Sequence, residues 1–346
     1  MGIVTQRVSS LLVRELAAEV GFQLAGVRPA GSAPDFDRFR AWAERGLAGE
    51  MRYLTDHRVD LRASVEHLLP GARSVISVGM LYNDQRRWPG IARYASIGED
   101  YHAVMRRKLE DLAARLSALA KFEWRTCVDT APILERSIAR DAGLGWIGKN
   151  TCLIDQELGS FFLLGELLTT LEIETDPQRD SPPPDRCGTC TRCIDACPTN
   201  AIVPSPQNGF ELDARLCISY FTIELRGAIP EEHRAAIGTN VFGCDICQDV
   251  CPWNRSETND AGPTPIDELE VPTEAEFRER YRTTAVSRTR YAGFLRNIAV
   301  AMGNAGLERF RPALGRLAAS PDPLVAEHGK WGLEQLDEKR RHSDIR

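Results

Sequence analysis

Apolar and polar positions follow two different periods along the first 170 residues, which predicts a mixture of strands and helices. Runs rich in apolar and β-branched residues at 21–27 and 74–81 predict two strands, and the turn Pro70-Gly71 precedes the second run. Apolar residues at helical spacing predict four helices, at 36–45, 61–69, 101–119 and 132–142. We therefore expect an α/β or α+β domain in the first half of the chain.

Two polar connectors interrupt this pattern further along the chain. Residues 176–186 are rich in proline, and residues 254–272 are rich in proline, aspartate and glutamate. Beyond the second connector, apolar residues recur only at helical spacing. The predicted helices there are 294–302, 312–319 and 324–336. Short helices joined by tight turns are typical of HEAT-like repeats.

Composition and charge limit the classes of partner. The chain has 346 residues, with 43% hydrophobic residues, 27% charged residues and a net charge of −6. Such a chain has no overall attraction to nucleic acid, so RNA contact would need a local basic patch. The longest apolar stretch, residues 161–171, contains Glu166 and is too short to span a bilayer. We expect a cytoplasmic protein with no membrane association, in which cysteines serve metal or redox chemistry.

Eight of the ten cysteines lie between residues 187 and 251, and four of them form one motif. In Cys187-x2-Cys190-x2-Cys193-x3-Cys197-Pro, three thiolates on a tight loop can bind one iron–sulfur cubane, while the fourth ligates a neighbouring cluster. A zinc knuckle is the alternative reading of the same spacing.

A second, altered half of the motif follows as Cys244-x2-Cys247-x3-Cys251-Pro. A full copy would have a cysteine at position 241, where the chain has Val241, and Cys217 is the natural substitute. The crossover rule of two-cluster ferredoxins then predicts two [4Fe-4S] clusters. Cluster 1 would take Cys187, Cys190, Cys193 and Cys251, and cluster 2 would take Cys197, Cys217, Cys244 and Cys247. Cys127 and Cys152 remain, and we interpret both as small buried hydrophobic residues.

The domain ahead of the clusters is larger than a ferredoxin needs, so we expect it to hold a second cofactor or a substrate. No G-x-G-x-x-G follows a predicted strand, which leaves a nucleotide cofactor without support. The segment Val128-Asp129-Thr130-Ala131-Pro132 places an acid just before a predicted helix. Asp129 is therefore either a helix N-cap or, if a pocket desolvates it, a proton donor.

Several long motifs resemble the epoxyqueuosine reductase family, a cobalamin-dependent family that completes queuosine in the tRNA anticodon. The segments are 128–150 (VDTAPILERSIARDAGLGWIGKN), 158–168 (LGSFFLLGELL), 187–201 (CGTCTRCIDACPTNA), 217–230 (CISYFTIELRGAIP) and 243–254 (GCDICQDVCPWN). The resemblance covers about residues 1–340 and implies three domains. They are an α/β (α+β) cobalamin- and substrate-binding domain at 1–175, a ferredoxin-like domain for two [4Fe-4S] clusters at 176–255, and a linker with α-helical HEAT-like repeats at 256–346.

The resemblance also implies a chemistry and a set of site residues. Electrons would pass singly from the clusters to cobalamin and then to the epoxide, while Asp129 protonates the departing oxygen. Cobalamin contacts would map to Arg62, Arg93, Asp129, Leu153, Leu164, Ser219 and Asp245. A D-x-H-x-x-G motif for a histidine ligand to cobalt is absent, because Met105 replaces the glycine after Asp100-Tyr101-His102. We interpret His102 as a surface or capping residue at a helix start.

The resemblance implies a tRNA partner, bound at the anticodon stem-loop, and an external low-potential electron donor. Arg288, Arg290 and Arg296, beside Tyr291 and Phe294, form the candidate RNA patch, although a solvated helix face is an equally good interpretation. The protein is expected to be a monomer. Two other functions remain open: a reductive dehalogenase acting on small organohalides, and a ferredoxin-like electron carrier that docks a partner protein.

Overall fold

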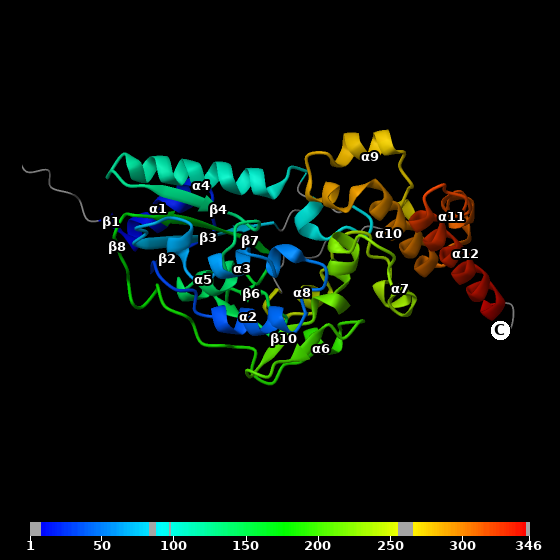
Figure 1. The fold of residues 1–346 in the computed structure, drawn as a ribbon, viewed down its shortest axis with the longest axis horizontal. Coiled ribbons are helices and arrows are strands. Elements are labelled where there is room, and N and C mark those ends of the chain that lie inside the picture. Colours follow the sequence, from blue (N-terminus) through cyan, green and yellow to red (C-terminus); the bar gives the residue numbers. More distant parts are fainter. Residues whose placement is uncertain (1–7, 83–87, 97, 255–265, 344–346) are drawn as a thin grey trace, which may run out of the picture.

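The computed structural model describes residues 8–82, 88–96, 98–254 and 266–343. Figure 1 shows an elongated molecule with a sheet domain at one end, helices α10 to α12 at the other end, and a lobe of short elements below them. The lobe carries the cysteine motifs. One buried apolar cluster contains residues of the sheet domain, the lobe and the C-terminal helices, so these three parts are in contact.

The sheet has four antiparallel strands in the order β2-β3-β7-β4. They are β2 (Leu24–Pro29), β3 (Ser74–Leu81), β7 (Phe162–Thr169) and β4 (Trp124–Cys127). The prediction for β3 is confirmed to the residue. The earlier strand begins at Leu24 instead of residue 21, because Gly21 adopts a left-handed conformation (φ 93°) that ends the preceding helix.

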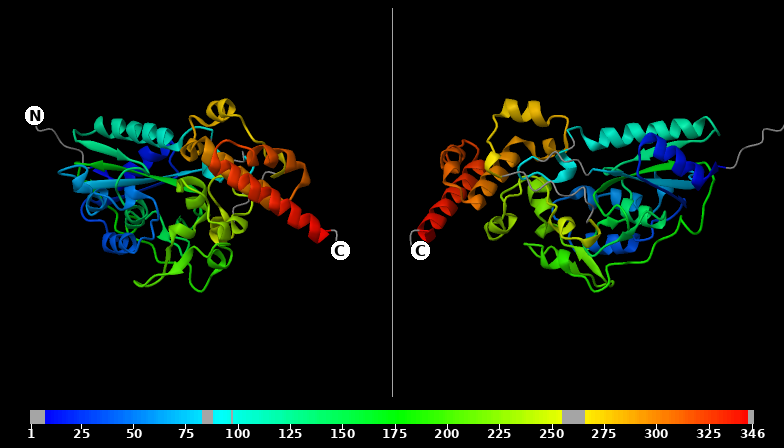
Figure 2. Two further views of the ribbon diagram at one scale, coloured as in Figure 1. Left: turned by 45° about the vertical axis from the view of Figure 1, so that its right-hand side comes forward. Right: turned by 180° about the vertical axis from the view of Figure 1, so that it is seen from behind.

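Both faces of the sheet are covered, and this explains the unbroken apolar run in β3. Helices α1 (Ser10–Val20) and α4 (Tyr101–Ser117) cover one face, where Ile76 of β3 packs in the same buried cluster as Leu109. Figure 2 shows α4 along that face from two further directions. On the other face, Val75 and Ile138 belong to a second buried cluster. The sheet is therefore a rigid base for the loops at its edges.

Two helix predictions on the second face are wrong in their bounds. Residues 61–69 form no continuous helix, since α3 (Arg58–Leu61) ends before the extended residue Ser64, whose side chain accepts a hydrogen bond from the amide of Glu66. Helix α5 (Glu135–Asp141) begins three residues later than predicted. A tight turn at Val128–Thr130 occupies the chain just before it, closed by a 2.5 Å hydrogen bond from the amide of Thr130 to the carbonyl of Val128.

The remaining elements of the first half are short. They are α2 (Phe36–Glu44) and the two-residue strands β1 (Val8–Ser9), β5 (Trp146–Ile147), β6 (Leu153–Ile154) and β8 (Ile173–Glu174). Strand β8 pairs in parallel with β1, so the end of the domain returns to its start.

The cysteine lobe contains little regular structure. Its elements are α6 (Arg192–Asp195), β9 (Ile202–Pro204), β10 (Phe210–Leu212), α7 (Glu231–Ile237) and α8 (Ile246–Asp249). A π-helical turn, Tyr220–Glu224, follows Cys217 and is buried against the C-terminal helices. Turns and caps therefore place most of the cysteines, rather than long strands or helices.

The C-terminal region is helical, as predicted. Two of the predicted helices are longer than the pattern indicated, the helix predicted at 312–319 is shifted by one residue, and the helix at 274–281 was not predicted. The helices are α9 (Glu274–Tyr281), α10 (Arg290–Ala305), α11 (Arg311–Ala318) and α12 (Pro323–Ser343). Helices α10 and α12 approach closely where glycine faces glycine. A side chain at Gly303 would place its Cβ 2.8 Å from the Cα of Gly332, which is too close for any residue but glycine. The expected connector at 254–272 falls for the most part on residues 255–265, outside the described residues.

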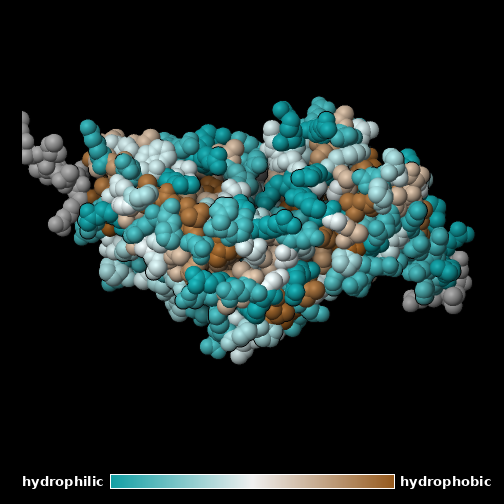
Figure 3. Space-filling model, in the orientation of Figure 1, coloured by the Kyte–Doolittle hydropathy of each residue, from teal (hydrophilic) through white to brown (hydrophobic). Residues whose placement is uncertain are grey.

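Hydrophilic residues cover most of the face seen in Figure 3, and hydrophobic residues show between them in the middle of the molecule. Among the described residues, no helix is both long enough and apolar enough to cross a membrane.

Candidate active site and cluster sites

Asp129 lies in the tight turn that links β4 to α5. Its φ of 47° is left-handed, an uncommon conformation for a residue other than glycine. Its backbone amide donates a 2.6 Å hydrogen bond to Oε1 of Glu135, the first residue of α5. The N-cap interpretation of Asp129 is wrong, since α5 begins after Leu134 and the Asp129 carboxylate points to other elements.

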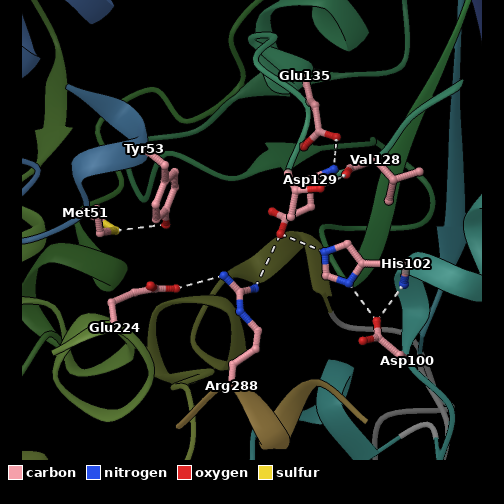
Figure 4. A network of polar contacts seen from close by, with 10 residues as sticks. Met51, Tyr53, Asp100, His102, Val128, Asp129, Glu135, Glu224 and Arg288 are labelled. Carbon is pink, nitrogen blue, oxygen red and sulfur yellow. Dashed lines mark hydrogen bonds and ion pairs between the residues drawn. The ribbon is translucent and has the colours of Figure 1, made fainter. Parts of the chain in front are cut away.

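The carboxylate of Asp129 faces two cationic side chains from distant segments (Figure 4). His102 Nε2 lies 3.0 Å from its Oδ2, and Arg288 Nη1 lies 3.4 Å from the same atom. The other imidazole nitrogen, Nδ1, lies 2.6 Å from Asp100, and Arg288 Nη2 lies 3.0 Å from Glu224. Two cations and three carboxylates thus form one network at the edge of the sheet.

This network sets the protonation state of the pair formed by Asp129 and His102. Partial burial works against the Asp129 carboxylate, but the hydrogen bond to His102 and the charge of Arg288 outweigh it and hold the pKa of Asp129 below its usual value. Burial opposes the charged imidazole as well, yet hydrogen bonds to Asp129 and Asp100 raise the pKa of His102. Within the pair, the two opposite shifts therefore favour the proton on His102 over Asp129.

Tyrosines line the same site. Burial raises the pKa of Tyr53 to about 12, with the charges of Glu224, Arg288 and Asp129 acting on it. Burial also raises the pKa of Tyr94, on which Arg288, Asp129 and Asp245 all act. Because Asp245 follows directly after Cys244, Tyr94 lies between the Asp129 network and the cysteine lobe.

The four cysteines predicted for cluster 1 line one cavity of about 290 Å³. Cys187, Cys190 and Cys193 come from the loop before α6 and from its first turn, while Cys251 follows α8. Lys149 Nζ donates to the backbone carbonyls of Gly188 (2.7 Å) and Cys190 (2.9 Å), which fixes the loop. The thiol set and the cavity fit a four-thiolate cubane.

The cysteines predicted for cluster 2 also lie together. Burial raises the pKa of Cys244 to about 12, and Cys217 and Cys197 are among the groups whose charges act on it. The pKa of the half-buried thiol of Cys247 is raised by its hydrogen bond with Cys152 and by desolvation, and the charges of Cys244 and Cys217 also act on it. Among the described residues, no three His, Cys, Asp or Glu side chains are arranged to hold a single metal ion. No fixed spacing in the sequence supported Cys217 as a member of this group. It lies near the other three cysteines, and the π-helical turn after it is held by hydrogen bonds from Arg296 and Asn297 of α10.

The two cysteines outside the motifs have different surroundings. Cys127 is 1% exposed in the apolar cluster on the α5 face of the sheet, which confirms its interpretation as a small hydrophobic residue. Cys152 is half-buried and forms a side-chain hydrogen bond with Cys247. It therefore lies against the cluster 2 cysteines instead of in an apolar core.

Four of the predicted cobalamin contacts lie together in two pairs. Leu153 and Leu164 belong to one apolar cluster beside the sheet. The amide of Arg93 donates a 2.8 Å hydrogen bond to Asp245, and the Arg93 guanidinium lies 4.3 Å from the centre of the Phe161 ring. Arg62 is 5% exposed. Arg62 and Arg93 are thus buried, and neither is a solvated surface charge.

The predicted RNA patch is not a single surface. Arg296 is 1% exposed and donates to the backbone carbonyls of Phe221, Leu225 and Gly227 at 2.6 to 2.9 Å. Its assignment as an RNA contact is therefore wrong, because its buried guanidinium donates its hydrogen bonds to the π-helical turn and the loop after it. Arg288 lies in the Asp129 network, and Arg290 is exposed at the start of α10.

The sequence did not indicate the site contacts of three residues around Asp129, which are His102, Glu224 and Glu135. His102 was interpreted as a surface or capping residue, yet it contacts Asp129 across 27 positions of the chain. Glu135 was treated as part of a helix. Asp100, two residues before His102, is a local sequence signal, but it indicates only the start of a helix. In the structure Asp100 does accept a hydrogen bond from the amide of His102.

Comparison with known proteins defines first the class and then the family. Residues 186–254 match the family model described as "4Fe-4S double cluster binding domain", so the chain is a two-cluster iron–sulfur protein. Residues 62–130 match the model described as "Epoxyqueuosine reductase QueG, DUF1730". An epoxyqueuosine reductase from Xanthomonas campestris pv. campestris is 43% identical, over 93% of this chain and 95% of its own length. The chain belongs to the epoxyqueuosine reductase family.

Solved structures of the family have the same fold. An epoxyqueuosine reductase crystallised with an epoxyqueuosine-modified tRNA-Tyr stem loop superposes with a TM-score of 0.80 at 29% identity, over 94% of this chain and 89% of that one. The Bacillus subtilis enzyme, with its catalytic aspartate loop swung out of the active site, gives a TM-score of 0.78 at 28% identity and the same coverage.

Proposed function

We propose that this protein reduces epoxyqueuosine to queuosine at the wobble position of tRNA, with two [4Fe-4S] clusters and cobalamin as cofactors. The observation that carries the proposal is the Asp129 network, which places a proton-holding pair beside the cysteine lobe in a chain of this family. Overall, two carbon–oxygen bonds break, a carbon–carbon double bond forms, and two electrons and two protons convert the epoxide oxygen to water.

Cobalamin, when bound, would take electrons singly from the clusters and pass them to the substrate. Arg62, Arg93, Leu153, Leu164, Ser219 and Asp245 are the residues that we propose to hold it. Their surroundings fit a large amphipathic group, since they combine an apolar cluster with buried arginines. Cys187, Cys190, Cys193 and Cys251 would ligate cluster 1, and Cys197, Cys217, Cys244 and Cys247 would ligate cluster 2.

Asp129 would deliver the proton to the departing oxygen, and His102 would supply it. His102 Nε2 lies 3.0 Å from the Asp129 carboxylate, and the raised pKa of His102 favours the proton on the imidazole. As negative charge develops on the oxygen, a proton can move from Nε2 to Oδ2 of Asp129 and on to the substrate. Arg288 would keep the carboxylate oriented and stabilise negative charge nearby.

For the substrate, we propose the tRNA anticodon stem-loop, which a family member binds in a crystal structure. Arg290 is the exposed candidate for a phosphate contact, and Arg288 is close enough to Asp129 to act at the modified base instead. The HEAT-like interpretation of α10 to α12 and the domain bounds 1–175, 176–255 and 256–346 belong to the same proposal, as does an external low-potential electron donor.

The test is a nucleoside analysis with fully loaded protein. The protein is purified without oxygen, reconstituted to about eight irons per chain, supplied with cobalamin and a strong reductant, and mixed with tRNA from cells that lack the activity. Loss of epoxyqueuosine with matching gain of queuosine is the expected result. An unchanged nucleoside profile would refute the proposal, and dehalogenation of a small organohalide instead would favour a reductive dehalogenase.

A further inference from the structure

Glu135 is a titratable residue beside the active site that the proposed chemistry does not use. It is half-buried at the start of α5, and its Oε1 accepts the 2.6 Å hydrogen bond from the backbone amide of Asp129. Figure 4 shows Glu135 on the opposite side of Asp129 from His102 and Arg288. Glu135 therefore contacts the backbone of the acid and not its reacting carboxylate.

The helix that carries Glu135 is firmly attached to the sheet domain. Ser137, Ile138 and Ala139 of α5 are buried. Ser137 Oγ donates a 2.6 Å hydrogen bond to Asp35, and Arg140 forms a 3.0 Å ion pair with the same carboxylate. Glu135 is thus a fixed point from which to hold a neighbouring loop.

The loop that Glu135 holds is in an uncommon conformation. A left-handed φ of 47° at a residue with a side chain persists only when its surroundings enforce it. This turn directs the Asp129 carboxylate at His102 and Arg288. A solved structure of the Bacillus subtilis relative has its catalytic aspartate loop swung out of the active site, so the equivalent loop in that protein has been seen away from the site.

From these contacts we propose that Glu135 is a positioning residue, which holds the amide of Asp129 and thereby keeps the Asp129 carboxylate aimed at His102 and Arg288. The inference rests on the proposed role of Asp129 as proton donor. Burial and the charge of Asp129 raise the pKa of Glu135 to about 8. The carboxyl group keeps an acceptor oxygen for the amide in either protonation state, and the hydrogen bond is stronger when the carboxylate is charged.

Two substitutions separate this role from a role in proton transfer. Glu135→Ala removes the acceptor, whereas Glu135→Gln keeps an acceptor oxygen at the same place but cannot exchange a proton. Glu231→Ala is the matched control, since Glu231 is an exposed first residue of α7 in the cysteine lobe. Each holoenzyme is assayed for kcat and KM on epoxyqueuosine tRNA, and hydrogen exchange is measured at the Asp129 amide.

We expect Glu135→Ala to lower kcat by about 10²-fold, as for other misplacements of a reacting group, with little change in KM and with faster exchange at the Asp129 amide. Glu135→Gln should retain most of kcat and the amide protection, and Glu231→Ala should match the parent protein. The inference is wrong if Glu135→Ala retains kcat or amide protection. It is also wrong if Glu135→Gln is as slow as Glu135→Ala while the amide stays protected.

Failure of the proposed function has a different signature. If the fully loaded parent protein leaves epoxyqueuosine unchanged, the reaction is misassigned, but the exchange rates still report whether Glu135 holds the Asp129 turn. An unchanged circular dichroism spectrum in every variant shows that the sheet domain has folded, and unchanged cluster absorbance shows that the lobe has folded.

Discussion

The sheet domain and the cysteine lobe place their functional residues by different physical means. In the sheet domain, seven of the eight residues of β3 are buried, and helices pack on both faces. His102 lies in the first turn of one of these helices, α4, and Asp129 lies in the turn after β4. In the lobe, α6 and α8 have four residues each, and seven of the eight motif cysteines are half-buried on these short helices or on turns, while Cys251 is buried. A hydrophobic core therefore defines the first region, whereas the second depends on the groups that it binds.

The contact between the two regions shows how they act as one site. Arg288 joins Asp129 of the sheet domain to Glu224 of the π-helical turn that follows Cys217. Arg296 holds the same turn from α10. The acid and the cysteines of cluster 2 are thus positioned from a common support, although they come from different parts of the chain.

The largest expected difference between the regions follows removal of the clusters. Anaerobic chelation of iron should abolish hydrogen-exchange protection in the cysteine segments 187–197 and 244–251, because Cys251 is the only buried residue in them. Protection in β3 and β7 should persist, since their buried core does not involve iron. Hydrogen exchange followed by mass spectrometry measures both. Equal protection of the lobe with and without iron would contradict the comparison.

The second prediction concerns the acid itself. Asp129→Asn keeps the shape of the side chain and an acceptor for His102, but it cannot deliver a proton, so kcat should fall by about 10²- to 10⁴-fold. Cluster absorbance should stay intact because no cysteine contacts change. Asp111→Asn, on the exposed side of α4, is the control and should leave kcat unaffected. Normal turnover by Asp129→Asn would exclude Asp129 as the proton donor.

The same division explains what the sequence could and could not predict. Cysteine spacing is local, so it predicted which four thiols line the cluster 1 cavity, and the apolar run of β3 gave its bounds. The Asp129 network is not local, because His102, Arg288 and Asp129 come from three distant segments. Periodicity also could not reveal that Arg296 is buried. Arginine followed by asparagine on a helix is typical of a solvent-exposed face, and only the packing of α10 against the π-helical turn buries it.

The third prediction tests the hydrophobic core of the sheet domain. Leu109 of α4 is fully buried against the sheet, so Leu109→Ala should lower the free energy of unfolding of this region by about 2–5 kcal/mol. Denaturant unfolding followed by circular dichroism measures the change, while cluster absorbance at low denaturant should be unchanged. Loss of the clusters from Leu109→Ala at denaturant concentrations at which the parent protein keeps them would show that the two regions are not independent.

The smallest expected effect is a change in pH dependence at the contact between the regions. Because the folded pKa of His102 is raised, its proton and its ion pair with Asp129 are fully present below the pKa of a free imidazole and are lost as pH rises through the raised pKa. Turnover should fall on the alkaline side for the same reason. Since Asp129 is well exposed, His102→Gln should change the free energy of unfolding by no more than about 1 kcal/mol.

The alkaline fall has a competing source in Glu135, whose pKa is raised to about 8 by burial and by the charge of Asp129. Profiles of kcat against pH for His102→Gln and Glu135→Gln separate the two. If His102 supplies the proton, the alkaline fall disappears in His102→Gln and persists in Glu135→Gln, because glutamine at 135 still holds the Asp129 amide. If the alkaline fall instead persists in His102→Gln and disappears in Glu135→Gln, Glu135 and not His102 supplies the proton.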